Sequence, residues 1–144
     1  MDLGIKGKKA IVCASSKGLG FGCALSLAEA GVDLIINSRN PQNLASAANL
    51  LKSKFQVRVE TVAADITTKE GQDAVIEKAK NNLDILVTNA GGPPPGVWSD
   101  WNRSDFILAL DANMLTPISL MKEVLPGMME KGWGRIVNIT SQSV

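Results

Sequence analysis

A glycine-rich segment near the amino terminus holds the residues best suited to bind a charged ligand. Residues 13–22 read Cys-Ala-Ser-Ser-Lys-Gly-Leu-Gly-Phe-Gly and follow an apolar run. Glycines at this spacing allow the backbone to approach a ligand, and free amide groups at the start of the next helix attract an anion. The pattern predicts a pyrophosphate site, although glycines that only turn the chain would look similar. The residues expected to line the site are Ala14, Ser16, Lys17, Gly18, Leu19 and Gly20.

The second apolar run ends in Asn37, Ser38 and Arg39, with no acidic residue among them. In dinucleotide-binding folds, an acidic side chain at this place binds the ribose hydroxyls of NAD and would repel a 2′-phosphate. Arg39 and Lys17 could instead converge on a phosphate, with the Ser38 hydroxyl beside them. Each cation alone would ordinarily be a solvated surface charge. Together, at these two places, they favour NADP(H).

The apolar pattern predicts a scaffold that brings such segments to one edge of a sheet. Near-continuous apolar runs at residues 10–14, 34–36, 57–64, 85–87 and 136–139 predict five buried strands, with helical patterns between them. Short connections of this kind imply right-handed crossovers, with helices on both faces of a parallel sheet. We therefore expect an α/β doubly wound parallel sheet of about five strands, the Rossmann fold, whose usual strand order would be 3-2-1-4-5.

Capping residues predict where several helices begin and end. Asn40 and Pro41 combine a capping side chain with the proline favoured in the first helical turn. Thr67 and Glu70 have the spacing of a capping box before a third helix. Gly31 lies where the first helix should stop before the second strand.

The composition restricts the class of protein. The chain has 144 residues, a net charge of +1, a hydrophobic fraction of 45% and a charged fraction of 20%, which favour one globular domain and give no reason to expect nucleic acid. It lacks a signal-peptide pattern and a run of about 20 apolar residues that could cross a membrane, so we expect a cytoplasmic protein. Cys13 and Cys23 lack metal-type spacing, and no metal site is predicted. We expect a single dinucleotide-binding domain over residues 1–144, incomplete at its carboxyl-terminal side and truncated after the fifth strand.

These features together resemble the short-chain dehydrogenase/reductase family, particularly the 3-oxoacyl-acyl-carrier-protein reductases. The family's turn reads Thr-Gly-x-x-x-Gly-x-Gly and matches residues 13–20, with Cys13 and Ala14 replacing the threonine and the first glycine. Alanine ordinarily requires a negative φ, which we expect here too. Residues 88–91, Thr-Asn-Ala-Gly, resemble the family's Asn-Asn-Ala-Gly, and residues 134–141 resemble the fifth strand that leads to its catalytic serine. The resemblance covers essentially the whole chain.

The resemblance implies roles for residues outside the glycine turn. Asp65 would meet the amino group of the adenine, with Ile66 beside it, although an aspartate at this place could also simply begin a turn. The residues that would border the nicotinamide ribose are Asn89, Ala90 and Gly91. Ser141 would be the catalytic serine, which orients the substrate.

Asn113 has a physical signal of its own. Pro117 follows it by four residues within a long helical stretch that is predicted from about residue 104. Because proline cannot donate a hydrogen bond, the carbonyl of Asn113 should be free and the helix kinked, either for structure alone or for a site. The matching asparagine of the family holds a water of the proton relay, which makes Asn113 and Ser141 the candidate catalytic residues.

The resemblance implies an oxidoreductase that transfers hydride between NADP(H) and a small carbonyl or alcohol substrate. The family's acid-base tyrosine and its lysine lie beyond the serine, and the sequence contains no tyrosine or histidine, so this chain alone is expected to be inactive. A non-catalytic NADP(H)-binding sensor or interaction module remains an alternative. A methyltransferase-like fold is a second, but it would ask for an acid where Ser38 and Arg39 stand. We also expect a homo-oligomer, because the family pairs its long helix across a subunit boundary.

Overall fold

The computed structural model describes residues 2–80, 82–92 and 95–140. Its strands are β1 (Lys9–Val12), β2 (Asp33–Ser38), β3 (Val59–Ala63), β4 (Ile85–Thr88) and β5 (Arg135–Asn138). Its α-helices are α1 (Gly18–Glu29), α2 (Pro41–Lys54), α3 (Lys69–Ala79), α4 (Arg103–Leu110) and α5 (Thr116–Glu130). A 3₁₀ turn at Trp98–Asp100 precedes α4, and a π-helical turn at Asp111–Leu115 joins α4 to α5. Within the described part, no helix is long and apolar enough to cross a membrane.

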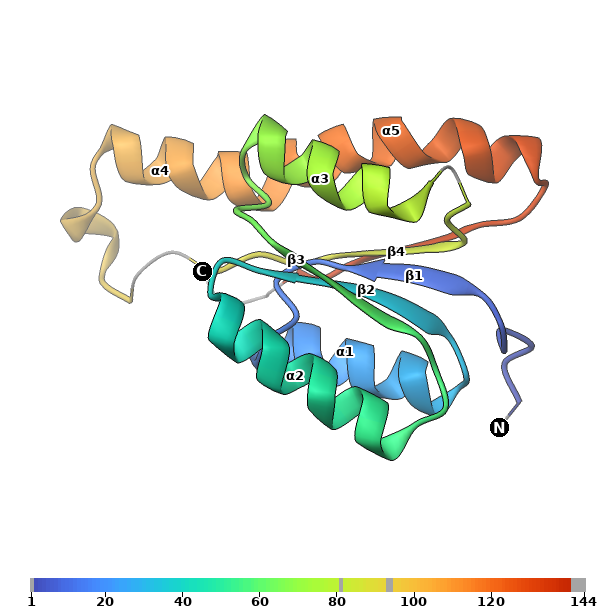
Figure 1. Cartoon of the computed structure of the whole chain (residues 1–144). Helices are drawn as coiled ribbons and strands as arrows, with labels where there is room; N and C mark the ends of the chain where they lie inside the picture. Colours follow the sequence, from blue (N-terminus) through green and yellow to red (C-terminus); the bar gives the residue numbers. More distant parts are fainter. Residues whose placement is uncertain (1, 81, 93–94, 141–144) are drawn as a thin grey trace.

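The five strands form one parallel sheet in the order β3-β2-β1-β4-β5. Helices α1 and α2 cover one face of the sheet, and α3, α4 and α5 lie on the other side (Figure 1). The predicted doubly wound sheet and its strand order are confirmed, with strand limits that differ from the apolar runs by a few residues. The edge strands β3 and β5 are largely exposed, so the prediction of five buried strands holds only for the three inner ones. All five carboxyl ends point to the same edge, which is where ligands bind in open α/β sheets.

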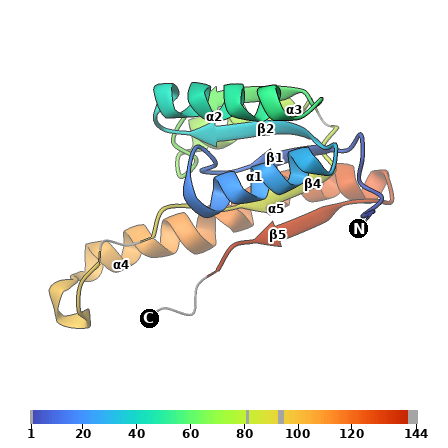
Figure 2. The same ribbon diagram turned by 90° about the horizontal axis from the view of Figure 1, so that it is seen from below.

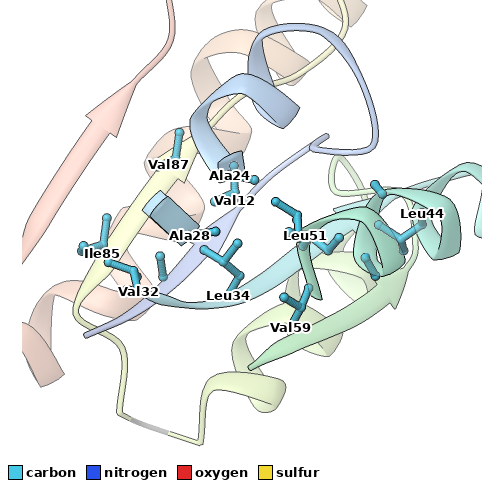
Figure 3. Close-up of a cluster of buried hydrophobic side chains, with 14 residues drawn as sticks. Val12, Ala24, Ala28, Val32, Leu34, Leu44, Leu51, Val59, Ile85 and Val87 are labelled. Carbon is cyan, nitrogen blue, oxygen red and sulfur yellow. The ribbon is translucent and has the colours of Figure 1, made fainter. Parts of the chain in front are cut away.

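A hydrophobic core lies on each face of the sheet. Figure 3 shows the core beneath α1 and α2, where Ala24, Ala28, Leu44 and Leu51 meet the side chains of the central strands. The opposite core joins Ile11 and other strand residues to side chains of α3 and α5. Because both faces are covered, β4 is buried along its whole length, which is why the central strands read as continuous apolar runs.

The carboxyl-terminal end of α1 and the start of α2 agree with the capping predictions. Gly31 has a φ of +78°, the left-handed conformation that commonly follows the end of a helix, and the chain turns there into β2. The Asn40 side chain accepts a hydrogen bond of 2.8 Å from the amide of Asn43, and Pro41 occupies the first turn of α2. The β2-α2 connection is therefore short and fixed, which matters because Ser38 and Arg39 lie in it.

The predicted capping box at Thr67 and Glu70 is wrong by one residue. Thr68 caps α3, and its hydroxyl accepts a hydrogen bond of 3.1 Å from the amide of Gly71. The amide and hydroxyl of Thr67 both donate to the Asp65 carboxylate, at 3.0 and 2.8 Å, so the Thr67 side chain is directed toward Asp65. A local Asx turn therefore competes with capping and shifts the start of the helix.

The long helical stretch is interrupted at the predicted place. Helices α4 and α5 follow one another end to end, joined by the π-helical turn at Asp111–Leu115, which contains Asn113 (Figure 2). Pro117 lies in the first turn of α5, where it has no amide hydrogen to offer the preceding turn. The extra residue of a π-turn is a common response to such an interruption.

A network of ion pairs lies at the opposite edge of the sheet, near the amino ends of β1 and β4. The Asp84 carboxylate accepts hydrogen bonds from the amide of Lys9 at 2.9 Å and from the Lys131 ammonium at 2.8 Å. The Lys8 ammonium lies 3.9 Å away, and it also stands over the ring of Trp133. Burial acts to raise the pKa of Asp84, but the Lys131 hydrogen bond, the Lys9 amide and the two ammonium charges together hold that pKa below its ordinary value.

Asp84→Asn is expected to lower the free energy of unfolding by about 2 kcal/mol at neutral pH, because Lys131 would lose a largely buried charged partner. Because the pKa of Asp84 is depressed in the folded state, its contribution is present above the ordinary aspartate pKa and is lost as the pH falls through the folded-state pKa. Urea unfolding at neutral and acidic pH measures both effects. Asp73→Asn is the matched control: Asp73 pairs with Lys69 on the exposed face of α3, so the loss should stay within about 0.5 kcal/mol. An equal loss in the two variants would contradict a special role for Asp84.

Candidate cofactor site

A cleft of about 850 Å³ lies at the carboxyl ends of β1, β2, β3 and β4. Its size is within the range of small-molecule and cofactor sites. Helix α4 extends beyond the ends of the strands (Figure 1). Side chains of α4 line one side of the cleft. The cleft is lined by most of the predicted cofactor-binding residues, namely Ala14, Ser16, Lys17, Gly18, Leu19, Ser38, Arg39, Asp65, Ile66, Asn89, Ala90 and Gly91.

The glycine turn joins β1 to the first turn of α1. Gly18 has a φ of +59° and begins the helix, with the exposed Lys17 extended before it. Ala14 has a φ of +46°, so the expectation of a negative φ at this alanine is wrong. The family pattern has glycine here, and the surrounding contacts hold the alanine in the left-handed conformation that glycine would adopt without strain.

Gly20 is the one predicted cofactor residue that does not line the cleft. It is buried beneath the turn. A Cβ atom there would lie 2.4 Å from the Ala14 carbonyl oxygen and 2.8 Å from the side-chain amide nitrogen of Asn89, Nδ2. Its role is therefore to let α1 approach the turn closely. The same Asn89 nitrogen donates to the carbonyl oxygen of Ala14 at 3.2 Å and more weakly to that of Cys13 at 3.4 Å.

The end of β4 is braced on both sides. Asn89 supports the glycine turn, while the neighbouring Thr88 hydroxyl donates to the Asn138 side chain on β5 at 2.7 Å. Thr88 and Asn138 are also register partners in the sheet. The threonine that replaces asparagine in the Thr-Asn-Ala-Gly segment thus links the strands through a side-chain hydrogen bond of its own.

Ser38 and Arg39 line the cleft at the end of β2. The Ser16 hydroxyl donates to the Ser38 hydroxyl at 2.9 Å, which joins the glycine turn to the end of β2. Arg39 and Lys17 are exposed, and both line the cleft. The Ser38 hydroxyl also accepts from the amide of Asn40 at 3.3 Å, so the serine is tied to the start of α2. Two cations and two hydroxyls make this end suited to an anion.

Asp65 places a carboxylate at the end of β3. The backbone amide of Thr67 is the main cause that lowers the pKa of Asp65; burial opposes this effect, while the Thr67 hydroxyl and the charge of Arg39 add to it. The carboxylate is therefore ionised at neutral pH and is available as a hydrogen-bond acceptor. Ile66 beside it is only 5% exposed and contributes to the core under α3 and α5.

Gly71 allows α3 to begin close to the Asp65 backbone. A Cβ atom at this first-turn residue of α3 would lie 1.9 Å from the carbonyl oxygen of Asp65. Only glycine allows the helix to begin this close to the end of β3.

Family comparison agrees with this geometry. Residues 8–144 match the sequence profile of the short chain dehydrogenases. The chain belongs to this family. Among its short chain dehydrogenase relatives, the 3-oxoacyl-[acyl-carrier-protein] reductase FabG of Rickettsia prowazekii is 32% identical over 137 residues, which are 95% of this chain and 55% of the relative.

Solved structures of short chain dehydrogenases resemble the fold closely. L-sorbose reductase from Gluconobacter frateurii, complexed with NADPH and L-sorbose, superposes with a TM-score of 0.88 and 35% identity over 94% of this chain and 53% of that protein. A 7α-hydroxysteroid dehydrogenase complexed with NADH and 7-oxo glycochenodeoxycholic acid gives a TM-score of 0.87 and 28% identity over 95% of this chain and 54% of that protein. The chain spans about half the length of these relatives.

The structure describes only one of the two predicted catalytic residues. Asn113 is exposed on the π-helical turn and does not line the cleft; its side-chain amide donates to the carbonyl of Ala109 at 3.1 Å. Ser141 lies outside the described residues. Both catalytic assignments therefore remain predictions.

Several lining residues were missed by the sequence reasoning. Asn37 belongs to β2 and is 1% exposed, and its only sequence signal is a polar residue at the end of an apolar run. The residues of α4 that line the cleft have no recognisable sequence pattern, because the position of α4 depends on the path of the preceding loop. The other missed lining residues are Asn40, Asn43, Ala64, Thr67, Gly92, Asp105, Leu108, Ala109, Asp111 and Ala112.

Proposed function

We propose that this chain binds NADP(H) in the cleft and that, in a full-length protein of this family, the bound cofactor exchanges hydride with a small carbonyl or alcohol substrate. The observation that carries the proposal is the end of the cleft where Ser38, Arg39 and Lys17 gather without an acidic residue at the end of β2. A cofactor phosphate there would meet hydroxyl donors and two cations. The bound cofactor would supply the hydride chemistry, while the chain supplies binding and orientation.

The rest of the cleft suits the other parts of a dinucleotide. The pyrophosphate would lie over the amides at the start of α1, which Gly18 and Gly20 allow the backbone to present. The Asp65 carboxylate would accept from the adenine amino group. Asn89, Ala90 and Gly91 would border the nicotinamide ribose, and the short segment they form is held by the contact of Asn89 with the glycine turn.

The choice of NADP(H) rests on these side chains rather than on family membership. The L-sorbose reductase structure contains NADPH, whereas the 7α-hydroxysteroid dehydrogenase structure contains NADH. Relatives of similar fold therefore use either cofactor. The local chemistry after β2 discriminates between them, because an acid favours the free ribose and cations favour its phosphate.

Binding without turnover is the expected behaviour of this chain by itself. The resemblance assigns proton transfer to a tyrosine, and the sequence contains none. The same observation favours the second candidate function, a non-catalytic NADP(H)-binding module. The oxidoreductase and the non-catalytic module would both bind the same cofactor, NADP(H).

A combined binding and turnover assay tests the proposal. NADPH is mixed with the chain and a panel of aldehydes, ketoses and 3-oxoacyl thioesters; binding is followed by NADPH fluorescence and turnover by the loss of NADPH absorbance. We expect saturable binding and no consumption. Consumption above a protein-free control would contradict the inactivity of the chain, and the absence of saturable binding would contradict the whole proposal.

We further propose that the chain self-associates through α4 and the following turn. Phe106, Leu110 and Met114 recur at helical spacing, and each has about half of its surface exposed, at 52%, 54% and 52%. An apolar stripe of this kind is uncommon on a monomeric surface. Sedimentation velocity should show a dimer or larger species that Leu110→Lys shifts toward monomer, whereas a wild-type monomer at high concentration would contradict self-association.

A further inference from the structure

We propose that Asn37 is a positioning residue for the cofactor site, because it holds Ala14 in the left-handed conformation that the glycine turn requires. The inference rests on the proposed function, which it deepens. It concerns Ala14, which stands where the family has glycine. It assigns the support of this left-handed alanine to the side chain of Asn37 on β2.

Ala14 adopts a conformation that residues with a Cβ atom rarely take. Its φ is +46°, and its peptide groups face two neighbouring strands. On one side its carbonyl oxygen accepts from Asn89 of the β4 end at 3.2 Å. On the other side its amide faces the Asn37 carbonyl oxygen, Oδ1, at 3.5 Å. The left-handed residue is therefore held between two asparagine side chains, one from each side of β1.

The orientation of the Asn37 side chain is determined by β3. Its amide nitrogen donates to the carbonyl oxygens of Val62 and Ala64, at 3.0 Å each. Both amide hydrogens are thus used, and Oδ1 must point toward the Ala14 amide. The reverse orientation would place Oδ1 against two carbonyl oxygens and the amino group against the Ala14 N–H, which would leave buried polar groups unpaired.

The backbone of Asn37 reinforces the same connection. Its carbonyl oxygen accepts from the amide of Ser15 at 2.8 Å, and its amide donates to the Ser15 hydroxyl at 3.1 Å. Ser15 follows Ala14 directly and is fully buried. Residue 37 therefore contacts both residues at the start of the turn, and it connects them to the ends of β2 and β3.

This arrangement links two halves of the cleft. The turn that would receive the pyrophosphate depends on the conformation of Ala14, while Ala64, which the Asn37 side chain contacts, precedes Asp65 at the adenine end. An apolar residue at position 37 would lose the contact with the Ala14 amide and the hydrogen bonds to the Val62 and Ala64 carbonyls. We infer that Asn37 acts on cofactor binding through Ala14, beyond any contribution to stability.

A double-mutant cycle separates this role from a merely structural one. Asn37→Ala is made alone and together with Ala14→Gly, and the NADPH dissociation constant is measured for all four proteins. In the presence of Ala14, Asn37→Ala should weaken binding by about tenfold or more; together with Ala14→Gly, the same change should cost about threefold or less. Glycine needs no support in the left-handed region, so the dependence on Asn37 should largely disappear. A structural role alone would give the same factor in both backgrounds and would overturn the inference.

Asn37→Ser serves if Asn37→Ala does not fold, because serine keeps one polar group but is too short to reach both β3 carbonyls and Ala14. Asn49→Ala, at an exposed position of α2, is the control and should change nothing in either background. Urea unfolding of the four proteins distinguishes failure of the inference from failure of the proposed function. If wild type binds no nucleotide, the proposed function fails, but the midpoint should still fall more with Ala14 present than with Ala14→Gly. Equal shifts would overturn the role of Asn37 even if NADPH binds.

Discussion

Gly20→Ala is expected to reduce NADPH affinity by at least about 100-fold and to lower the free energy of unfolding by about 3 kcal/mol. The added Cβ atom would lie 2.4 Å from the Ala14 carbonyl oxygen and 2.8 Å from the Asn89 amide nitrogen. Neither neighbour can retreat freely, because the first is backbone and the second braces the turn. The start of α1 would therefore move away from the turn that it shapes. Fluorescence titration and urea unfolding measure the two effects.

Gly22→Ala is the matched control for this substitution. Gly22 lies in the same helix, two residues further on, and its Cβ atom would have nothing within 4 Å. Alanine is favoured over glycine inside a helix by about 1 kcal/mol, so this variant should be at least as stable as wild type and should bind NADPH equally well. Wild-type affinity in Gly20→Ala would show that the close approach of α1 to the turn is not needed for binding.

Arg39→Glu is expected to weaken NADPH binding by about 100-fold while changing NADH binding by about twofold or less. A charge-assisted contact to the 2′-phosphate would be lost and a like charge placed beside it. NADH lacks this phosphate, so it should not respond in the same way. Calorimetric or fluorescence titration with both nucleotides at one fixed ionic strength gives the comparison, since surface electrostatics are screened by salt.

Lys52→Glu carries the same change of charge and is the control for Arg39→Glu. Lys52 is exposed in the last turn of α2, away from the cleft. Its substitution should leave both nucleotides unaffected. An equal loss of NADPH affinity in Lys52→Glu, or an equal loss of NADH affinity in Arg39→Glu, would mean that the effect is general electrostatics or misfolding and not phosphate recognition.

Much of the fold could be predicted because its signals are local. The inner strands β1, β2 and β4 are largely buried, so each leaves a continuous apolar run. The alternation of strands and helices implies right-handed crossovers in a parallel sheet, and the order 3-2-1-4-5 is the usual one of the Rossmann fold. Asn40 and Gly31 cap helices through contacts within a few residues of themselves, and both predictions are confirmed. The glycine turn was recognisable because its chemistry depends on residues that are adjacent in the sequence.

The errors and omissions all involve competition or contacts between distant segments. Thr67 does not cap α3, because an Asx turn directs its hydroxyl to the Asp65 carboxylate, a competition that spacing alone does not reveal. Ala14 takes a positive φ because Asn37 and Asn89, far along the chain, contact its peptide groups. The α4 wall of the cleft depends on where the chain leads after β4. Side chains that act across strands can be found only when the strands are placed together.

The most direct test of the central claim is a side-by-side titration of this chain with NADPH and NADH, followed by fluorescence at fixed salt. The cations and hydroxyls around Ser38 and Arg39 predict saturable binding of both nucleotides, with NADPH bound at least about tenfold more tightly. Equal affinities, or tighter binding of NADH, would contradict the assignment of this end of the cleft to a phosphate.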